Sequence, residues 1–257
     1  MDDYKEQEKL HYNMRYKDKE TFIRDEVNIY DMVNENAVRY FYAHVKSIIK
    51  DKGQISILDY GCGDGDKSIP LVSKDIMLTG IDISDKSIDQ AQVKYSQHKN
   101  VSFEVMDCEK TTFKDDTFDM IFDYGTFSNI DISTAIHEIH RILKPDGVLV
   151  CIETLGHNPI INLKRRISAW RGKRTQWASS HIMKIKNWVE IQNMFESNQI
   201  KHFNILSILF APIMRFLPSK LSYHILDYLW SIDSKLVNNE AIAKYAFKTV
   251  AVFRELK

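Results

Sequence analysis

Short apolar segments alternate with helical segments between residues 55 and 153, and this alternation constrains the fold more than any other feature. The apolar segments cover residues 55–60, 76–82, 101–107, 117–125 and 148–153. Strands that are apolar along nearly their whole length belong to a parallel sheet covered by helices on both faces. The sequence therefore predicts an α/β fold with a doubly wound sheet.

The segments outside this alternation predict the rest of the organisation. Residues 1–50 are polar and then helical, so we expect an N-terminal helical cap there and a main domain over residues 51–257. After residue 153 the alternation loosens. We expect an insertion over 154–186, a helix over 185–198, two last strands within 201–209 and 245–256, and a helical insertion over 210–245 that packs on the body.

Composition excludes several classes of protein. The 35 basic and 35 acidic side chains cancel, so a globally basic nucleic-acid surface is absent, and we expect no nucleic-acid partner. The charged first residues predict no signal peptide, and no apolar run approaches the roughly 20 residues that span a bilayer. Three scattered cysteines, Cys62, Cys108 and Cys151, favour reduced thiols and a cytoplasmic protein.

Three glycines follow the first apolar segment, at Gly61, Gly63 and Gly65, and a helix is expected after them. Glycines there allow a ligand to approach the backbone closely. The loop lacks the Gly-Lys-Ser/Thr of a P-loop, and it contains carboxylates at Asp59, Asp64 and Asp66, which repel a pyrophosphate. The pattern favours a nucleoside with a positively charged, non-phosphate tail.

Four motifs in order resemble those of class I S-adenosylmethionine-dependent methyltransferases, over roughly residues 30–155. They are ILDYGCGDG (57–65), GIDIS (80–84), VMDCEKTTF (105–113), and FDMIFDYGTFSNIDI (118–132) with LKPDGVLVCIE (143–153). The resemblance implies a Rossmann-like sheet of seven strands whose last strand is antiparallel. It also implies S-adenosylmethionine as cofactor, S-adenosylhomocysteine as product, and methyl transfer as the activity.

The resemblance also implies the cofactor-binding residues. Asp59 and the backbone of Gly61, Cys62 and Gly63 are expected at the methionine part. Asp82, nineteen residues after Gly63, is placed to take two ribose hydroxyls, as its position at the end of the second strand also suggests. The remaining positions are Ile83 on adenine, Asp107 and the Cys108 backbone at the adenine amine, and Asp123 and Tyr124 beneath the sulfonium end.

A general base is harder to assign. Ser128-Asn129 stands where many small-molecule relatives carry two histidines. The segment from residue 152 resembles a bacterial subgroup with a Gly-His-Asn-Pro motif, which makes His157 the first catalytic candidate and His181 the second. A loop-fixing role for His157 is an equal alternative. The HEIH segment at residues 137–140 lacks the His-Glu-x-x-His spacing, so we expect no metal site.

The acceptor side is inferred from charge. No acidic residue occurs from Thr154 to Val189, whereas the span holds eight lysines and arginines. Arg165, Arg166 and Arg174 are therefore expected to bind a small anionic acceptor, such as a phosphorylated or nucleotide-linked sugar or an acidic metabolite, with O-methylation favoured. The basic segment could instead be a solvated face. Alternative acceptors are a lipid or quinone, with peripheral membrane contact, and structured RNA. Alternative functions of the whole chain are an inactive cofactor-binding subunit and a nicotinamide oxidoreductase. The oligomeric state is left open.

Overall fold

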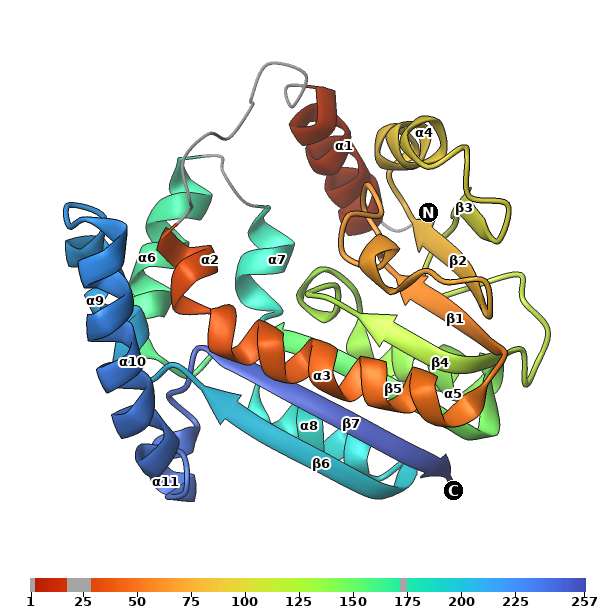
Figure 1. Cartoon of the computed structure of the whole chain (residues 1–257). Coiled ribbons are helices and arrows are strands. Elements are labelled where there is room, and N and C mark those ends of the chain that lie inside the picture. Colours follow the sequence, from red (N-terminus) through yellow and green to blue (C-terminus); the bar gives the residue numbers. More distant parts are fainter. Residues whose placement is uncertain (1–2, 18–28, 172–174) are drawn as a thin grey trace.

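The computed structural model describes residues 3–17, 29–171 and 175–257 and contains one sheet of seven strands (Figure 1). The strand order is β3-β2-β1-β4-β5-β7-β6. Only β7 runs against its neighbours, since it pairs antiparallel with both β5 and β6. This confirms the predicted sheet and its antiparallel last strand. The strands are β1 (Ile55–Tyr60), β2 (Ile76–Asp82), β3 (Val101–Val105), β4 (Phe118–Asp123), β5 (Leu143–Thr154), β6 (Phe195–Phe203) and β7 (Lys248–Leu256).

Helices cover both faces of the sheet. On one face α3 (Glu35–Lys52) buries Phe41 and Val45 against β1 and β4, because its apolar residues recur at helical spacing. On the other face α5 (Ile132–Ile142) and α8 (Ile185–Gln192) close a second core that contains Trp188. The remaining helices are α1 (Asp3–Lys17), α2 (Ile29–Val33), α4 (Asp85–Lys94), α6 (Pro159–Trp170), α7 (Gln176–Ser180), α9 (Ser207–Met214), α10 (Ser219–Leu236) and α11 (Glu240–Ala243).

The order of the strands fixes where a ligand can bind. The chain starts in the middle of the sheet at β1, moves outward to β2 and β3, and then crosses back to β4 on the other side. Loops after β1 and β4 leave in opposite directions, so a crevice opens at the carboxyl ends of these two strands.

Two predicted elements differ from the structure near the C-terminus. The strand predicted over 201–209 lies earlier, at Phe195–Phe203, and the apolar residues that follow form α9. The helix predicted over 185–198 accordingly ends at Gln192. A short apolar run does not distinguish strand from helix, and pairing with β7 makes the polar segment 195–203 an edge strand.

The predicted helix after the glycine loop is also wrong. Residues 61–75 form turns and one short 3-10 segment, η2 (Ile69–Leu71), in place of an α-helix. Pro70 lies in the middle of this short stretch, where it lacks the N–H that a helix would need. The loop is instead held by contacts with side chains of neighbouring segments, as described below. The domain division at residue 50 stays a prediction.

Candidate active site

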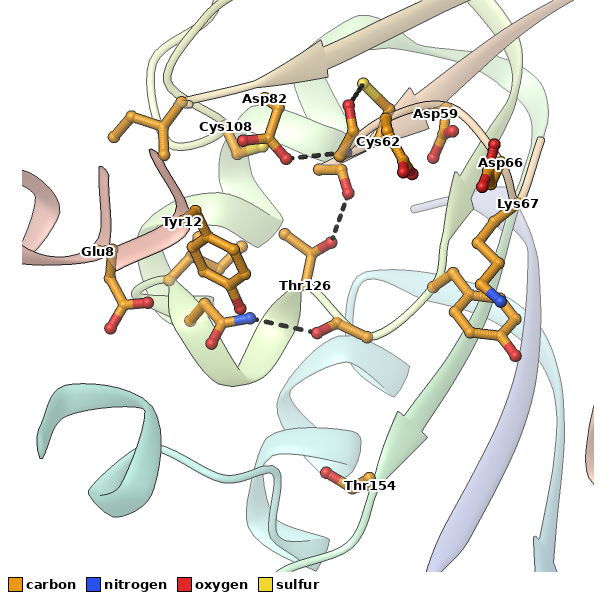
Figure 2. A pocket seen from close by; sticks show the side chains of 18 of the residues that line it. Glu8, Tyr12, Asp59, Cys62, Asp66, Lys67, Asp82, Cys108, Thr126 and Thr154 are labelled. Carbon is orange, nitrogen blue, oxygen red and sulfur yellow. Dashed lines mark hydrogen bonds between the residues drawn. The ribbon is translucent and has the colours of Figure 1, made fainter. Parts of the chain in front are cut away.

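A cleft of about 1190 Å³ opens at the carboxyl ends of β1, β2 and β4 (Figure 2). Nine of the ten predicted cofactor residues line it, namely Asp59, Gly61, Cys62, Gly63, Asp82, Ile83, Asp107, Cys108 and Tyr124. Residues from the ends of four strands, β1, β2, β3 and β4, therefore meet in one cavity, as the sheet topology requires. Burial raises the pKa of the Cys62 and Cys108 thiols well above the usual value, which favours their role as loop fillers over that of nucleophiles.

Gly61 begins the loop with a backbone that only glycine adopts easily, at φ +76°. A Cβ atom at this position would lie 2.2 Å from Thr126 Oγ1. That hydroxyl donates to the Tyr60 carbonyl at 2.8 Å, which joins the loop after β4 to the end of β1. The glycine thus lets two loops approach closely and form one wall of the cleft.

Asp82 fixes the position of the next loop. Its Oδ2 accepts from the Gly63 N–H at 2.9 Å, and its Oδ1 accepts from the Ser84 N–H at 2.8 Å. Each carboxylate oxygen has a further lone pair, and the side chain lines the cleft (Figure 2). This geometry can accept two hydroxyl groups of a ligand while it holds the glycine loop in place.

Asp59 is a buried carboxyl at the floor of the same cleft. The Ser68 hydroxyl donates to its Oδ2. Burial, together with the nearby carboxylates of Asp82 and Asp64, raises the pKa of Asp59 to about 7. A positively charged ligand would favour the charged form of this group, so binding is expected to release a proton.

This pKa predicts a pH-dependent affinity for a cationic ligand. Affinity for S-adenosylmethionine should rise several-fold from about pH 6 to about pH 7.5, because Asp59 loses its proton over that range. Calorimetric titration at several pH values measures this, and Asp59→Asn should flatten the profile. Because folding raises the pKa of Asp59, the protonated side chain stabilises the folded state. This stabilisation is fully present below the pKa that Asp59 has in the unfolded state, and it is lost as pH rises through about 7. A pH-dependence identical in wild type and variant would contradict the assignment.

Asp123 is the one predicted cofactor residue that does not line the cleft. It is fully buried, and its Oδ1 accepts from the Thr126 N–H at 3.0 Å. Burial and the neighbouring Glu153 carboxylate raise its pKa well above the usual value. Asp123 therefore supports the loop after β4, whereas its neighbour Tyr124 faces the cleft.

Helix α1 forms a wall of the cleft that the sequence reasoning missed. Tyr4, Glu8 and Tyr12 follow one another at one-turn spacing and line the cleft together with Lys5. The Lys5 Nζ lies 2.8 Å from both Asp107 Oδ2 and Glu109 Oε2. The helical spacing of these four residues could have indicated that they share one face. However, α1 is polar, and it lacks the apolar face that would have predicted packing of this helix on the cleft.

The contacts of Lys5 predict a role for α1 in ligand affinity. Lys5→Ala removes two half-buried ion pairs that hold α1 beside Asp107, so S-adenosylhomocysteine affinity should fall about tenfold. Lys9→Ala is the matched control, because Lys9 pairs with the more exposed Asp85 at 3.2 Å and should change affinity little. Equal affinities for both variants and wild type would show that α1 contributes nothing to binding.

A smaller cavity of about 420 Å³, here called the side hollow, adjoins the cleft. Both cavities share Glu8, Tyr12, Gly125, Asn129, Thr154, Phe247 and Lys248. The rest of the lining of the side hollow includes residues of α6, α7 and the end of β5, among them Glu153, Lys164 and Arg165. A ligand in the cleft and a second molecule in the side hollow would therefore meet beside Lys248.

Glu153 is buried at this junction and Lys248 is partly buried near it, and neither was predicted as a binding residue. Glu153 Oε1 accepts from the Phe127 N–H at 2.5 Å and Oε2 from the Thr154 N–H at 3.2 Å. Burial raises the pKa of Glu153, although the charge of Lys248 opposes the shift. Burial lowers the pKa of Lys248, although Glu153 and Asp123 oppose that shift.

The predicted catalytic histidines lie outside the lining of both cavities. His157 Nε2 accepts from the Ile185 N–H at 3.1 Å, which favours the loop-fixing alternative. His181 is exposed and stacks on Trp177, with 3.5 Å between the ring centres, and Tyr4 stacks on the other face of that ring. Both histidines thus have contacts that account for their positions.

The three predicted acceptor arginines have different surroundings. Arg165 is buried and lines the side hollow, and its Nη1 donates to Asn162 Oδ1 at 2.9 Å. Arg166 is exposed and lines neither cavity. Arg174 lies outside the described residues. Lys164 and Lys248, which the prediction did not include, add positive charge to the side hollow.

Comparison with known proteins shows what this chain is similar to. Residues 57–147 match the family model of the methyltransferase domain. Demethylmenaquinone methyltransferase of Staphylococcus aureus (strain MRSA252) is 34% identical over 116 residues, which cover 42% of this chain and 48% of that protein. The chain thus spans about half the length of the curated relatives that it matches.

Solved structures show the same fold over more of the chain. Geranyl diphosphate C-methyltransferase from Streptomyces coelicolor A3(2) aligns with a TM-score of 0.59 and 14% identity, over 98% of both chains. Haemonchus contortus phosphoethanolamine N-methyltransferase 2 aligns with a TM-score of 0.58 and 18% identity, over 85% of this chain and 52% of that chain. At such identities the likeness concerns the fold alone.

Proposed function

We propose that this chain, a class I S-adenosylmethionine-dependent methyltransferase by its domain and fold, transfers the methyl group to a small anionic acceptor bound in the side hollow. One observation carries the proposal, namely that an acidic cleft and a basic hollow meet at Lys248. Each cavity suits one reactant, and their shared wall is where the reactants would meet.

The charges of the two cavities differ in sign. The cleft is lined by nine carboxylates and three lysines, which favours a ligand of net positive charge such as S-adenosylmethionine. The side hollow is lined by Lys164, Arg165 and Lys248 against two carboxylates, Glu8 and Glu153. This surplus of positive charge favours an acceptor that carries a phosphate or carboxylate.

In the cleft, each part of the cofactor has its own group of residues. Asp82 would accept the ribose hydroxyls, Ile83 would pack on adenine, and Asp107 with the Cys108 backbone would take the adenine amine. At the opposite end, Asp59, the glycine loop and Tyr124 would surround the methionine part. The cofactor supplies an already activated methyl group, so the main task of the protein is to align the acceptor and exclude water, which accounts for roughly 7–11 kcal/mol of such barriers.

On the acceptor side, Lys248 would hold the anionic group and Glu153 would fix the loop beside it. Glu153 accepts from the Phe127 N–H, which places the residues after β4 against the junction. We favour transfer to an oxygen of a phosphorylated or nucleotide-linked sugar or another acidic metabolite. Neither histidine is assigned as base, because neither lines the side hollow.

The test is methyl transfer from radiolabelled S-adenosylmethionine to a panel of small alcohols. The panel contains phosphorylated, carboxylated, neutral and cationic compounds of similar size. The proposal predicts transfer to anionic members, with rates that fall as salt rises. Transfer confined to neutral or cationic members would contradict the anionic acceptor. Cofactor binding without transfer to any member would favour an inactive cofactor-binding subunit.

A further inference from the structure

Helix α6 presents an apolar stripe to the outside of the molecule. Ile160, Leu163, Ile167 and Trp170 are 59%, 60%, 44% and 85% exposed. Their spacing of three, four and three residues puts all four side chains on one face of the helix. Single exposed apolar residues are common, but a continuous stripe along three turns marks an interaction surface.

Positive charge flanks this stripe on both sides. Arg171 lies one turn after Ile167 on one side, and Arg166 lies on the other. Both are exposed, and no acidic residue occurs between Thr154 and Val189. The protein as a whole has no net charge, so this helix is a local concentration of positive charge.

The stripe is distinct from the side of α6 that packs on the protein. Ile161 is buried in an apolar cluster with Ile208 and Met214 of α9, and Arg165 is buried beside the side hollow. The helix therefore has an inner face that packs on the protein and an outer apolar face that is exposed among the residues the structure describes.

The end of α9 adds apolar surface at the same end of the molecule. Phe210, Ile213 and Phe216 are 42%, 59% and 79% exposed, and Arg215 lies among them. Figure 1 shows α6 and α9 together at the end of the molecule opposite α4. Both helices thus combine large apolar side chains with basic ones.

We infer that α6, together with the end of α9, docks the protein on an anionic lipid surface. A helix with an apolar stripe between basic residues lies in the plane of the headgroups, with its aromatic and aliphatic side chains in the acyl boundary. The basic flanks complement anionic headgroups. Among the residues the structure describes, no helix has the length and apolar character of a membrane span. The inference does not depend on the proposed acceptor.

The test is co-sedimentation of the full chain with vesicles. Vesicles of phosphatidylcholine alone are compared with vesicles of equal parts phosphatidylcholine and phosphatidylglycerol. We expect binding to the anionic vesicles at least about tenfold tighter than to the neutral ones, and weaker binding at high salt. Trp170→Ser and Arg166→Glu should each reduce binding to anionic vesicles about tenfold. S-adenosylhomocysteine affinity should not change, since neither residue lines the cleft.

Val93→Ser is the matched control, because Val93 is 79% exposed on α4 at the other end of the molecule. This variant should bind anionic vesicles as the wild type does. Equal binding of wild type to both kinds of vesicle, or unchanged binding of Trp170→Ser, would overturn the inference. Sedimentation velocity measures the oligomeric state of wild type and Leu163→Ser. If wild type were a dimer and Leu163→Ser a monomer, the stripe would bind a second copy of the chain and not lipid.

Discussion

Replacing Asp82 with alanine is expected to weaken S-adenosylhomocysteine binding at least tenfold. The variant lacks the carboxylate that would accept from two ribose hydroxyls, and hydrogen bonds to a charged group contribute about 1.5–3 kcal/mol each. The variant also releases the Gly63 and Ser84 N–H groups that its carboxylate now holds, so the glycine loop loses its anchor. Isothermal titration calorimetry measures the change directly.

Asp89→Ala provides the control for this measurement. Asp89 lies on α4 and pairs with the exposed Lys86, far from the lining of the cleft. Its replacement should leave affinity unchanged within error. If Asp82→Ala bound S-adenosylhomocysteine as tightly as wild type, the ribose assignment would be wrong.

Replacing Lys248 with methionine is expected to raise the KM of an anionic acceptor tenfold or more. A charge-assisted hydrogen bond contributes about 1.5–3 kcal/mol, and methionine keeps the length of the side chain without its charge. Affinity for S-adenosylhomocysteine should change much less, because the thioether of this ligand carries no charge and needs no charged partner at Lys248. Steady-state kinetics with the best anionic acceptor, together with calorimetry, separate the two effects.

Two controls make the Lys248 result interpretable. Arg166→Ala removes a positive charge that the sequence assigned to the acceptor but that lines neither cavity, and it should leave acceptor KM unchanged. Thermal unfolding of Lys248→Met reports whether the loss of a positive charge near buried Glu153 has destabilised the fold. An unchanged KM for a stable Lys248→Met would remove Lys248 from the acceptor site.

Local sequence patterns identified nine residues that the structure brings to the lining of one cleft. Asp59, the three glycines and Asp82 each stand at the carboxyl end of a strand, and parallel topology brings such ends together. The sheet followed from the same apolar segments. Asp123 does not line the cleft, because the direction of a side chain at the end of a strand also depends on the loop that follows. Here that carboxylate turns toward the Thr126 N–H.

The other half of the site depends on contacts far apart in sequence. Lys5 and Asp107 form an ion pair although about a hundred residues separate them in the sequence, and no sequence periodicity predicts such a pair. Lys248 begins the last strand, and only the antiparallel insertion of β7 beside β5 brings it near Glu153. In the same way, the histidine after β5 was recognisable as a motif, but its partner Ile185 could not be read from the sequence.

A crystal structure with bound S-adenosylhomocysteine tests the central claim most directly. The account predicts that the ribose hydroxyls lie within hydrogen-bond distance of Asp82 and that the sulfur lies at the junction beside Lys248, facing the side hollow. A ligand bound outside the cleft, or one whose sulfur faces away from the side hollow, would contradict the proposed meeting of cofactor and acceptor.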